Sequence, residues 1–166
     1  MTAHWRPMVA ADLVEVERIA KIVHPAYPES EEVPMERLAL FPAGCLIAES
    51  PVGAVLGYAV SHPSRLGRPP ALDSRLGVLP ADADCLYLHD VALLPEARGL
   101  GLGDSLVVLL RALAARSGLA LLALTAVNRS APYWRRRGFL DHSGDGVLAA
   151  KLTSYGDDAV YMVSSA

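Results

Sequence analysis

The sequence predicts an α/β fold, and three observations support that prediction. Short apolar runs of strand length alternate along the chain with segments whose apolar residues recur at helical spacing. Hydrophobic residues make up 52% of the 166 residues and charged residues 20%, which is typical of a chain that folds around a core. We find neither an internal repeat nor a linker-like stretch, so residues 1–166 are expected to form a single domain.

The first half of the chain predicts the following elements. A strand is expected at 5–8, followed by a helix that Asp12 caps and that Pro25 and Pro28 end. The apolar face of this helix would consist of Leu13, Val16, Ile19, Ala20 and Val23. The other elements expected here are a short helix over 35–40 and two strands over 44–49 and 55–61, joined by a turn at 51–53. Prolines and glycines in 63–84 predict a long irregular loop, and a loop of this length could wall a functional site.

The second half begins with a strand suited to burial. Residues 85–94 are rich in apolar side chains, and Pro95 marks their end because proline cannot donate a ladder hydrogen bond. A helix is expected directly after Gly103, since Leu102, Leu106, Leu109, Leu110 and Leu113 recur at helical spacing. The remaining elements are a strand over 119–127, a short helix within 130–139, and a last strand over 159–163 beside 147–151.

The turn between the strand and the helix has the features of a phosphate-binding site. Gly99, Gly101 and Gly103 remove every second side chain, so that backbone N–H groups can approach an anion closely. The free N–H groups at the start of the helix point back at the turn, which suits a pyrophosphate. Asp104 stands where a P-loop requires lysine, and neither frame of the glycines completes the dinucleotide pattern.

The segment Arg98-Gly99-Leu100-Gly101-Leu102-Gly103 resembles the acetyl-coenzyme A signature of the GNAT family of N-acetyltransferases. The preceding strand at 88–95 resembles the acyl-transfer segment of this family, and Ser130 to Phe139 resembles its second signature. The resemblance implies a mixed central sheet flanked by helices and acetyl-CoA as cosubstrate. The cofactor-binding residues that it implies are Val91, Ala92, Leu93, Arg98, Gly99, Leu100, Gly101, Leu102, Gly103, Asp104 and Asn128.

Acid–base candidates lie next to these residues. An amine must lose a proton before it can attack a thioester, and Asp90 is the favoured base, acting through water, with His89 as the second candidate. Strand alternation would send the two to opposite faces, so only one is expected at the reaction centre. The family often places a tyrosine four residues before the glycine of its second signature, where this chain has Trp134. Tyr133, another tyrosine or solvent would then protonate the leaving thiolate, and Asn128 is also one residue away from the family register.

The resemblance implies an N-acetyltransferase that moves the acetyl group directly to a primary amine of a small molecule or peptide. A noncatalytic acyl-CoA sensor is the alternative. A group of glutamates could attract a cationic amine: Glu29, Glu31, Glu32 and Glu36. A run of arginines could approach the phosphates of CoA: Arg135, Arg136 and Arg137. For both groups the alternative is ordinary surface charge.

Composition sets further expectations. A formal net charge of −3 argues against nonspecific nucleic-acid binding, and the five histidines lack paired ligand spacing, so no metal is expected. Cys45 and Cys85 are expected to be core thiols rather than a disulfide. Neither a signal pattern nor a membrane-spanning run is recognisable, which favours a cytoplasmic protein without a membrane partner, with a homodimer as a possible assembly.

Overall fold

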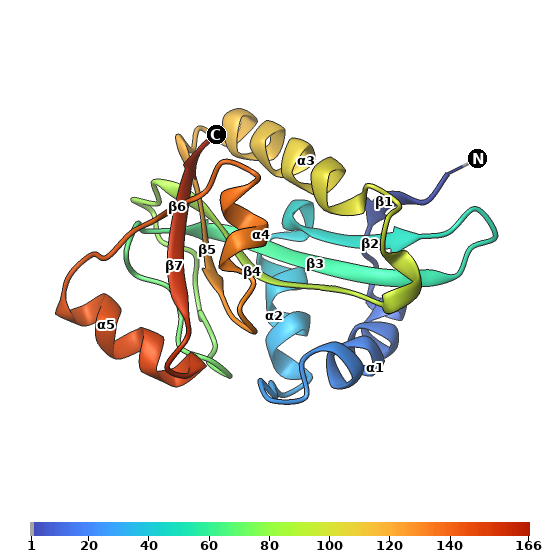
Figure 1. The fold of residues 1–166 in the computed structure, drawn as a ribbon, viewed down its shortest axis with the longest axis horizontal. Coiled ribbons are helices and arrows are strands. Elements are labelled where there is room, and N and C mark those ends of the chain that lie inside the picture. The colour runs from blue at the N-terminus through green and yellow to red at the C-terminus, as the bar shows by residue number, and fades with distance from the viewer. Residues whose placement is uncertain (1) are drawn as a thin grey trace.

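A seven-stranded sheet organises the computed structural model, which describes residues 2–166 (Figure 1). The strands lie in the order β1-β2-β3-β4-β5-β7-β6. Their bounds are β1 His4–Pro7, β2 Cys45–Glu49, β3 Val55–Ser64, β4 Cys85–Leu93, β5 Leu121–Ala126, β6 Leu140–Asp141 and β7 Val160–Ser165. Neighbouring strands are antiparallel except for β4 and β5, which are parallel, so the sheet is mixed.

Helices cover both faces of this sheet (Figure 1). Their bounds are α1 Leu13–Val23, α2 Glu32–Leu40, α3 Leu102–Arg116, α4 Ala131–Arg135 and α5 Gly146–Leu152. The helix α3 packs Leu106 and Leu110 against Leu86 and Leu88 of β4. Cys85 of β4 points to the other face, where it belongs to the cluster around Leu148 of α5. None of these helices is both long enough and apolar enough to cross a membrane, in the part of the chain described.

The apolar pattern of the sequence explains the packing on the α1 side. Val16 and Ile19 lie one turn apart on α1 and are buried against Tyr58 and Ala92 of the sheet. Cys45 and Cys85 are both buried and both free, as expected for core thiols. The predicted α/β architecture with a mixed sheet flanked by helices is therefore confirmed.

One extra residue interrupts β4 where it pairs with β3. The register runs from Val60 opposite Asp90 to Ser61 opposite Leu88, so His89 has no partner on β3. A bulge of this kind shifts the alternation of side chains by one position. Leu88 therefore packs on the α3 side, while Asp90 contacts His24 at the end of α1.

The strands β4 and β5 pair only near their beginnings. Within the described chain their register covers Cys85–Leu88 against Leu121–Leu124, whereas β4 continues to Leu93 (Figure 1). The Leu94 N–H donates to the Leu56 carbonyl oxygen on β3 at 2.8 Å, so by alternation the backbone groups of Val91 and Leu93 face the opposite edge. We call the space between this edge and the end of β5 the β4–β5 split.

Two local predictions are wrong. Residues 147–151 lie inside α5, because Asp145 accepts the N–H groups of Val147 and Leu148 at 3.1 and 3.2 Å and caps a helix there. The carboxylate of Asp12 makes no capping bond to α1. It accepts the Val9 N–H at 2.8 Å and pairs with Arg6 at 2.9 Å instead.

The other predicted boundaries differ by a few residues. The strand expected at 55–61 continues to Ser64, and the strand expected at 119–127 is shortened to β5. The helix expected at 35–40 begins at Glu32, with Pro34 in its first turn, where a missing N–H costs nothing. The short strand β6 was not anticipated from the sequence.

Candidate active site

The glycine turn lies at the beginning of α3, as the sequence predicts. Gly99 and Gly101 have φ angles of 78° and 73°, a left-handed conformation that favours glycine. A Cβ added at Gly101 would meet nothing within 4 Å, so the space above the turn is open. Arg98 is exposed beside it, and the first N–H groups of the 15-residue α3 are without helical partners. These groups fit an anion such as a pyrophosphate.

The other residues of the turn segment have different surroundings. Leu100 is exposed, whereas the side chain of Leu102 is buried near Leu56, so only its backbone could face a ligand. The Trp5 indole N–H donates to the Leu102 carbonyl oxygen at 2.9 Å, which ties β1 to the start of α3. Asp104, in the first turn of α3, forms an ion pair with Arg137 at 2.9 Å.

Gly103 makes room for a side chain of the protein and not for a ligand. A Cβ at Gly103 would overlap the hydroxyl group of Tyr133. Arg137 stacks on the ring of Tyr133 at 3.6 Å from its centroid, and burial raises the pKa of that hydroxyl. Trp134 is buried against Phe139 in the core. The structure thus places Tyr133 beside the start of α3, outside the cavity that holds Asp90.

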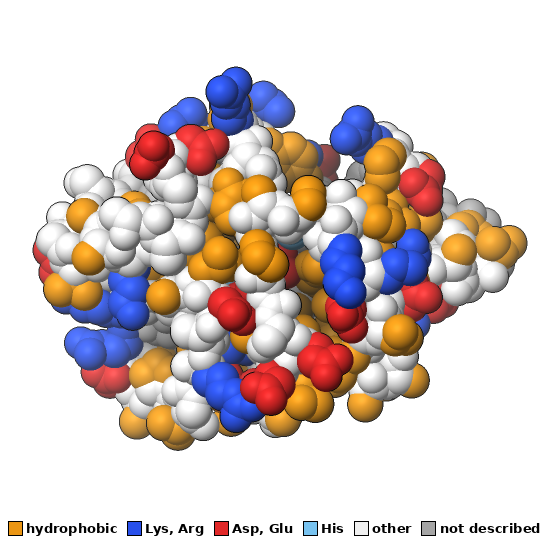
Figure 2. Space-filling model, turned by 90° about the horizontal axis from the view of Figure 1, so that it is seen from below, with side chains coloured by type: hydrophobic (Ala, Val, Ile, Leu, Met, Phe, Trp, Pro, Cys, Tyr) orange, Lys and Arg blue, Asp and Glu red, His pale blue; other side chains and the backbone are white. Residues whose placement is uncertain are grey.

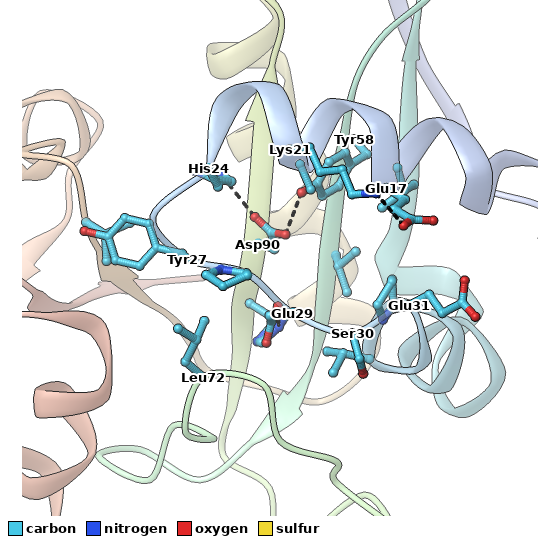
Figure 3. Close-up of a pocket in the computed structure, with 18 of the residues that line it drawn as sticks. Glu17, Lys21, His24, Tyr27, Glu29, Ser30, Glu31, Tyr58, Leu72 and Asp90 are labelled. Atoms are coloured by element: carbon cyan, nitrogen blue, oxygen red, sulfur yellow. Dashed lines mark hydrogen bonds and ion pairs between the residues drawn. The ribbon is translucent and has the colours of Figure 1, made fainter.

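A cavity of about 300 Å³ lies beside β4 on its α1 side (Figure 3). The end of α1, the segment 24–31, and residues of β3, β4 and β5 form its walls. Leu72 from the loop after β3 also lines it, so this loop contributes to the wall as the sequence suggested.

Asp90 is the central carboxylate of this cavity. The Tyr58 hydroxyl donates to its Oδ2 at 2.7 Å, and Nε2 of His24 lies 3.3 Å from its Oδ1. Burial by itself would favour the neutral acid. The hydrogen bond and charge of His24, with the Tyr58 hydroxyl, outweigh burial and hold the pKa of Asp90 below its ordinary range. Asp90 is therefore a carboxylate at neutral pH.

His24 is a site residue that the sequence analysis missed. It lies just after α1, and its Nε2 is 2.9 Å from the Val91 carbonyl oxygen as well as near Asp90. Its Nδ1 is 3.5 Å from the amide nitrogen of Asn128, which follows β5 on the other side of the split. Burial lowers the pKa of His24, but the hydrogen bond to Asp90 and its charge raise it further, so the net shift is upward.

His89 lies on the same side of the sheet as Asp90. Both residues line the cavity, so the expectation that alternation would separate them is wrong, because the bulge at His89 resets the alternation. The Nε2 of His89 is 2.9 Å from Glu29, whose other oxygen accepts the Asp73 N–H at 2.9 Å. The His89 side chain is only 2% exposed.

The remaining charged candidates fall into two groups. Glu29 and Glu31 line the cavity, whereas Glu32 pairs with Arg75 and Glu36 with Arg37. Arg135 pairs with Asp141, away from the glycine turn. Figure 2, which views the molecule from below the orientation of Figure 1, shows acidic and basic side chains interspersed over that face. Among residues 2–166, no group of three or more His, Cys, Asp or Glu side chains is arranged to hold a metal.

Ala92 differs from its neighbours among the predicted cofactor residues. Val91 and Leu93 direct their backbone groups into the β4–β5 split, while those of Ala92 alternate toward β3. A Cβ on Gly57 of β3 would overlap the Ala92 carbonyl oxygen, which places that oxygen against β3. The structure therefore leaves the Val91 N–H and the backbone groups of Leu93 open to a ligand, whereas the Val91 carbonyl oxygen is bonded to His24 and the backbone of Ala92 is occupied by β3.

Comparisons with known proteins agree with this geometry. Solved structures with the same fold include Ard1 from Thermoplasma volcanium, with 14% identity, a TM-score of 0.71, and coverage of 99% of this chain and 98% of that chain. Naa50 from Arabidopsis thaliana, solved with the bisubstrate analogue CoA-Ac-MVNAL, has 10% identity, a TM-score of 0.72 and full coverage of both chains. The GNAT-like decarboxylase GphF, solved with isobutyryl-CoA, has 15% identity, a TM-score of 0.76, and coverage of 98% of each chain.

Sequence comparison adds the family. A search of curated protein sequences finds no significant match. A family model described as the acetyltransferase (GNAT) family matches residues 16–139, which include most of α1, the bulged strand β4, the glycine turn and the Gly138-Phe139 pair. The match covers well over half of the chain, and it includes His24, Asp90 and the glycine turn. The chain belongs to the GNAT acetyltransferase family.

Proposed function

We propose that this protein is an N-acetyltransferase that moves the acetyl group of acetyl-CoA directly to a primary amine. One observation carries the proposal: a single strand, β4, brings an open backbone edge, the Val91 N–H and the backbone groups of Leu93, next to the Asp90 carboxylate at a cavity. Membership of the GNAT family supports acyl transfer from CoA. Two neighbours were solved with CoA derivatives, which supports the same class of cosubstrate.

The acetyl-CoA would occupy two connected features. The N–H groups at the start of α3, with Arg98, would hold the pyrophosphate, because a helix N-terminus and a guanidinium both favour anions. The Val91 N–H and the backbone groups of Leu93 would pair with the pantetheine arm in the β4–β5 split, while the Val91 carbonyl oxygen stays bonded to His24. A backbone N–H fixed there would polarise the thioester carbonyl without any reorganisation during the reaction.

The acceptor would enter through the cavity beside Asp90. The carboxylates that line this cavity are Glu17, Glu29, Glu31 and Asp90. Among the described residues that line it, Lys21 is the only lysine or arginine. Such a balance favours a cationic acceptor, such as a small amine or a peptide with a free amino group. A volume of about 300 Å³ suits an acceptor group of this size.

A noncatalytic acyl-CoA sensor is the second candidate. It is favoured by the position of Tyr133, which packs on Gly103 and so does not supply an acid to the cavity. A sensor would bind acetyl-CoA in the same turn and split but would leave the thioester intact.

One preparation can decide between the two. Acetyl-CoA binding would be measured by calorimetry, and release of free CoA thiol would then be followed with a panel of small amines and short peptides. We expect binding together with amine-dependent thiol release. Binding without release by any acceptor would favour the sensor, and absence of binding would contradict both candidates.

A further inference from the structure

We propose that Nδ1 of His24 is the atom that takes the proton from the acceptor amine, and that Asp90 is a positioning residue that holds the His24 ring. The inference rests on the proposed acetyl transfer and assigns one of its steps to a named atom. It changes the role of Asp90 from base to partner of the base, and it makes His24 a catalytic residue.

The hydrogen bonds of His24 fix which ring nitrogen carries the proton. Nε2 lies 2.9 Å from the Val91 carbonyl oxygen, which can only accept a hydrogen bond, so Nε2 must carry the hydrogen. Oδ1 of Asp90, 3.3 Å from the same nitrogen, is a second acceptor for that hydrogen. In the neutral ring the lone pair therefore resides on Nδ1, and the Asn128 amide nitrogen, a donor, lies 3.5 Å from it.

Two carboxylates of the cavity, Asp90 and Glu29, are already engaged. Both oxygens of Asp90 have partners, His24 and the Tyr58 hydroxyl, and a carboxylate stabilised in this way holds protons weakly. Glu29 accepts from the Asp73 N–H and pairs with His89. The remaining nitrogen of His89, Nδ1, is buried without a hydrogen-bond partner, and the side chain is only 2% exposed.

His24 also has the electrostatic surroundings of a base that works near neutral pH. The other titratable groups that line its cavity come from every element around it; they are Glu17 and Lys21 on α1, Tyr27, Glu29 and Glu31 on its own segment, Tyr58 on β3, His89 and Asp90 on β4, and Tyr155 after α5. Burial opposes a charge on the ring, but Asp90, with smaller help from Glu29, raises the pKa of His24 above its ordinary value. The side chain is 18% exposed, so the ring is accessible from the cavity that it lines.

The step assigned to His24 balances without a further reactant. The amine nitrogen forms a bond to the acetyl carbon, the bond between that carbon and the CoA sulfur breaks, and the thiolate leaves with the electron pair. Before the attack, the ammonium form of the acceptor loses one proton to Nδ1, and the resulting imidazolium is stabilised by Asp90. His24 then returns this proton to solvent. The nitrogen loses a second proton as the amide forms and the thiolate takes up one proton from solvent, so one proton is released overall and Tyr133 is not required.

The test compares three variants with the wild-type protein by pH–rate profiles, using one amine throughout so that its own ionisation contributes equally. His24→Gln retains a donor at the position of Nε2 but has no base, and Asp90→Asn retains the shape of the carboxylate but not its charge. His4→Gln is the matched histidine control, because His4 is exposed at the start of β1. The pKa of His24 would also be measured by NMR titration of its imidazole in the protein without substrates.

We expect His24→Gln to lower kcat by about 10²- to 10³-fold with little change in acetyl-CoA affinity, and to remove the acidic limb of the profile. Asp90→Asn should retain that limb, moved to lower pH, and should lower the pKa of His24 seen by NMR. Near-wild-type kcat in His24→Gln, or an unchanged limb, would overturn the inference while leaving acetyl transfer intact. If the wild-type protein binds acetyl-CoA but acetylates no amine, the proposed function fails and the assigned step fails with it.

Discussion

At the scale of single residues, the state of the Asp90 carboxylate depends on donors from distant parts of the chain. Tyr58 comes from β3, where buried neighbours hold its ring, and His24 comes from the end of α1. Each donor stabilises the charged form against the cost of burial. Removal of either one should therefore change catalysis more than it changes the fold.

Tyr58→Phe tests this dependence. The substitution keeps the ring in the core and removes the 2.7 Å hydrogen bond to Oδ2 of Asp90. The pKa of Asp90 should therefore rise, and Asp90 should hold the His24 ring in place less firmly. We expect kcat to fall by about tenfold, consistent with the loss of one charged hydrogen bond, while the KM for acetyl-CoA stays the same. Tyr161→Phe is the control, since that buried hydroxyl accepts the Gly67 N–H outside the cavity. Equal steady-state activity of the two variants would contradict this role for Tyr58.

Residue identity in the site was only partly predictable from sequence. Asp90 and the glycine turn are local signals, because strand, turn and helix follow one another in the chain. His24 gives no such signal: a histidine before Pro25 looks like the end of a helix, and only the packing of α1 on β4 brings it to Asp90. The position of Tyr133 against Gly103 likewise follows from how α4 meets α3, which no motif specifies.

At the scale of secondary-structure elements, α3 has a left-handed glycine at each end. Gly101 precedes its first turn and Gly118 follows its last, and both have a φ of 73° and open space where a Cβ would project. The two positions thus impose the same backbone requirement. Only Gly101 lies at the end whose free N–H groups are proposed to hold the pyrophosphate.

Gly101→Val and Gly118→Val form a matched pair. Each should cost about 1–2 kcal/mol of stability, because a β-branched residue is strained in the left-handed region. Gly101→Val should also weaken acetyl-CoA binding by at least about tenfold, because its side chain projects into the space above the turn, whereas Gly118→Val should bind like the wild-type protein. Calorimetry gives the affinities and thermal denaturation the stabilities. Equal affinities in the two variants would remove the turn from the binding site.

The same scale shows why some elements were predicted and others were not. The strands of the central sheet and α3 have clear apolar periodicity, which packing then reinforces. Residues 147–151 are short and apolar, so periodicity alone cannot separate strand from helix, and the capping carboxylate of Asp145 decides the outcome. The bulge at His89 has no sequence signature, since it arises from a register difference between two paired strands.

At the scale of the whole molecule, folding changes how readily a buried histidine, His62, takes up a proton. His62 on β3 is 1% exposed; its Nδ1 donates to the Pro63 carbonyl oxygen at 3.0 Å, and its Nε2 is buried without a hydrogen-bond partner. Burial, with the nearby His89 and Arg37, lowers the pKa of His62 to about 3. The folded protein therefore keeps His62 neutral at pH values where the unfolded chain binds a proton.

The sign of the resulting pH dependence follows from linkage. Below the ordinary histidine pKa of about 6.5, the unfolded chain binds a proton at His62 and the folded protein does not. The free energy of unfolding therefore decreases by about 1.4 kcal/mol for each pH unit by which the pH is lowered, down to the pKa of His62 in the folded protein. His24, whose pKa is raised, acts in the opposite sense: its stabilisation is complete below the ordinary pKa and is lost as pH rises. A wild-type curve alone would mix the two contributions.

His62→Gln separates them, because glutamine is neutral at every pH and leaves His24 unchanged. Urea denaturation at pH 6.5 and pH 5 should show that the wild-type protein loses about 2 kcal/mol more stability between these values than His62→Gln does. His4→Gln, exposed on β1, should follow the wild-type curve. Parallel curves for the wild-type protein and His62→Gln would mean that the folded protein accepts a proton at His62. A protonated His62 would then add a second positive charge near that of Arg37, beside the His89 ring.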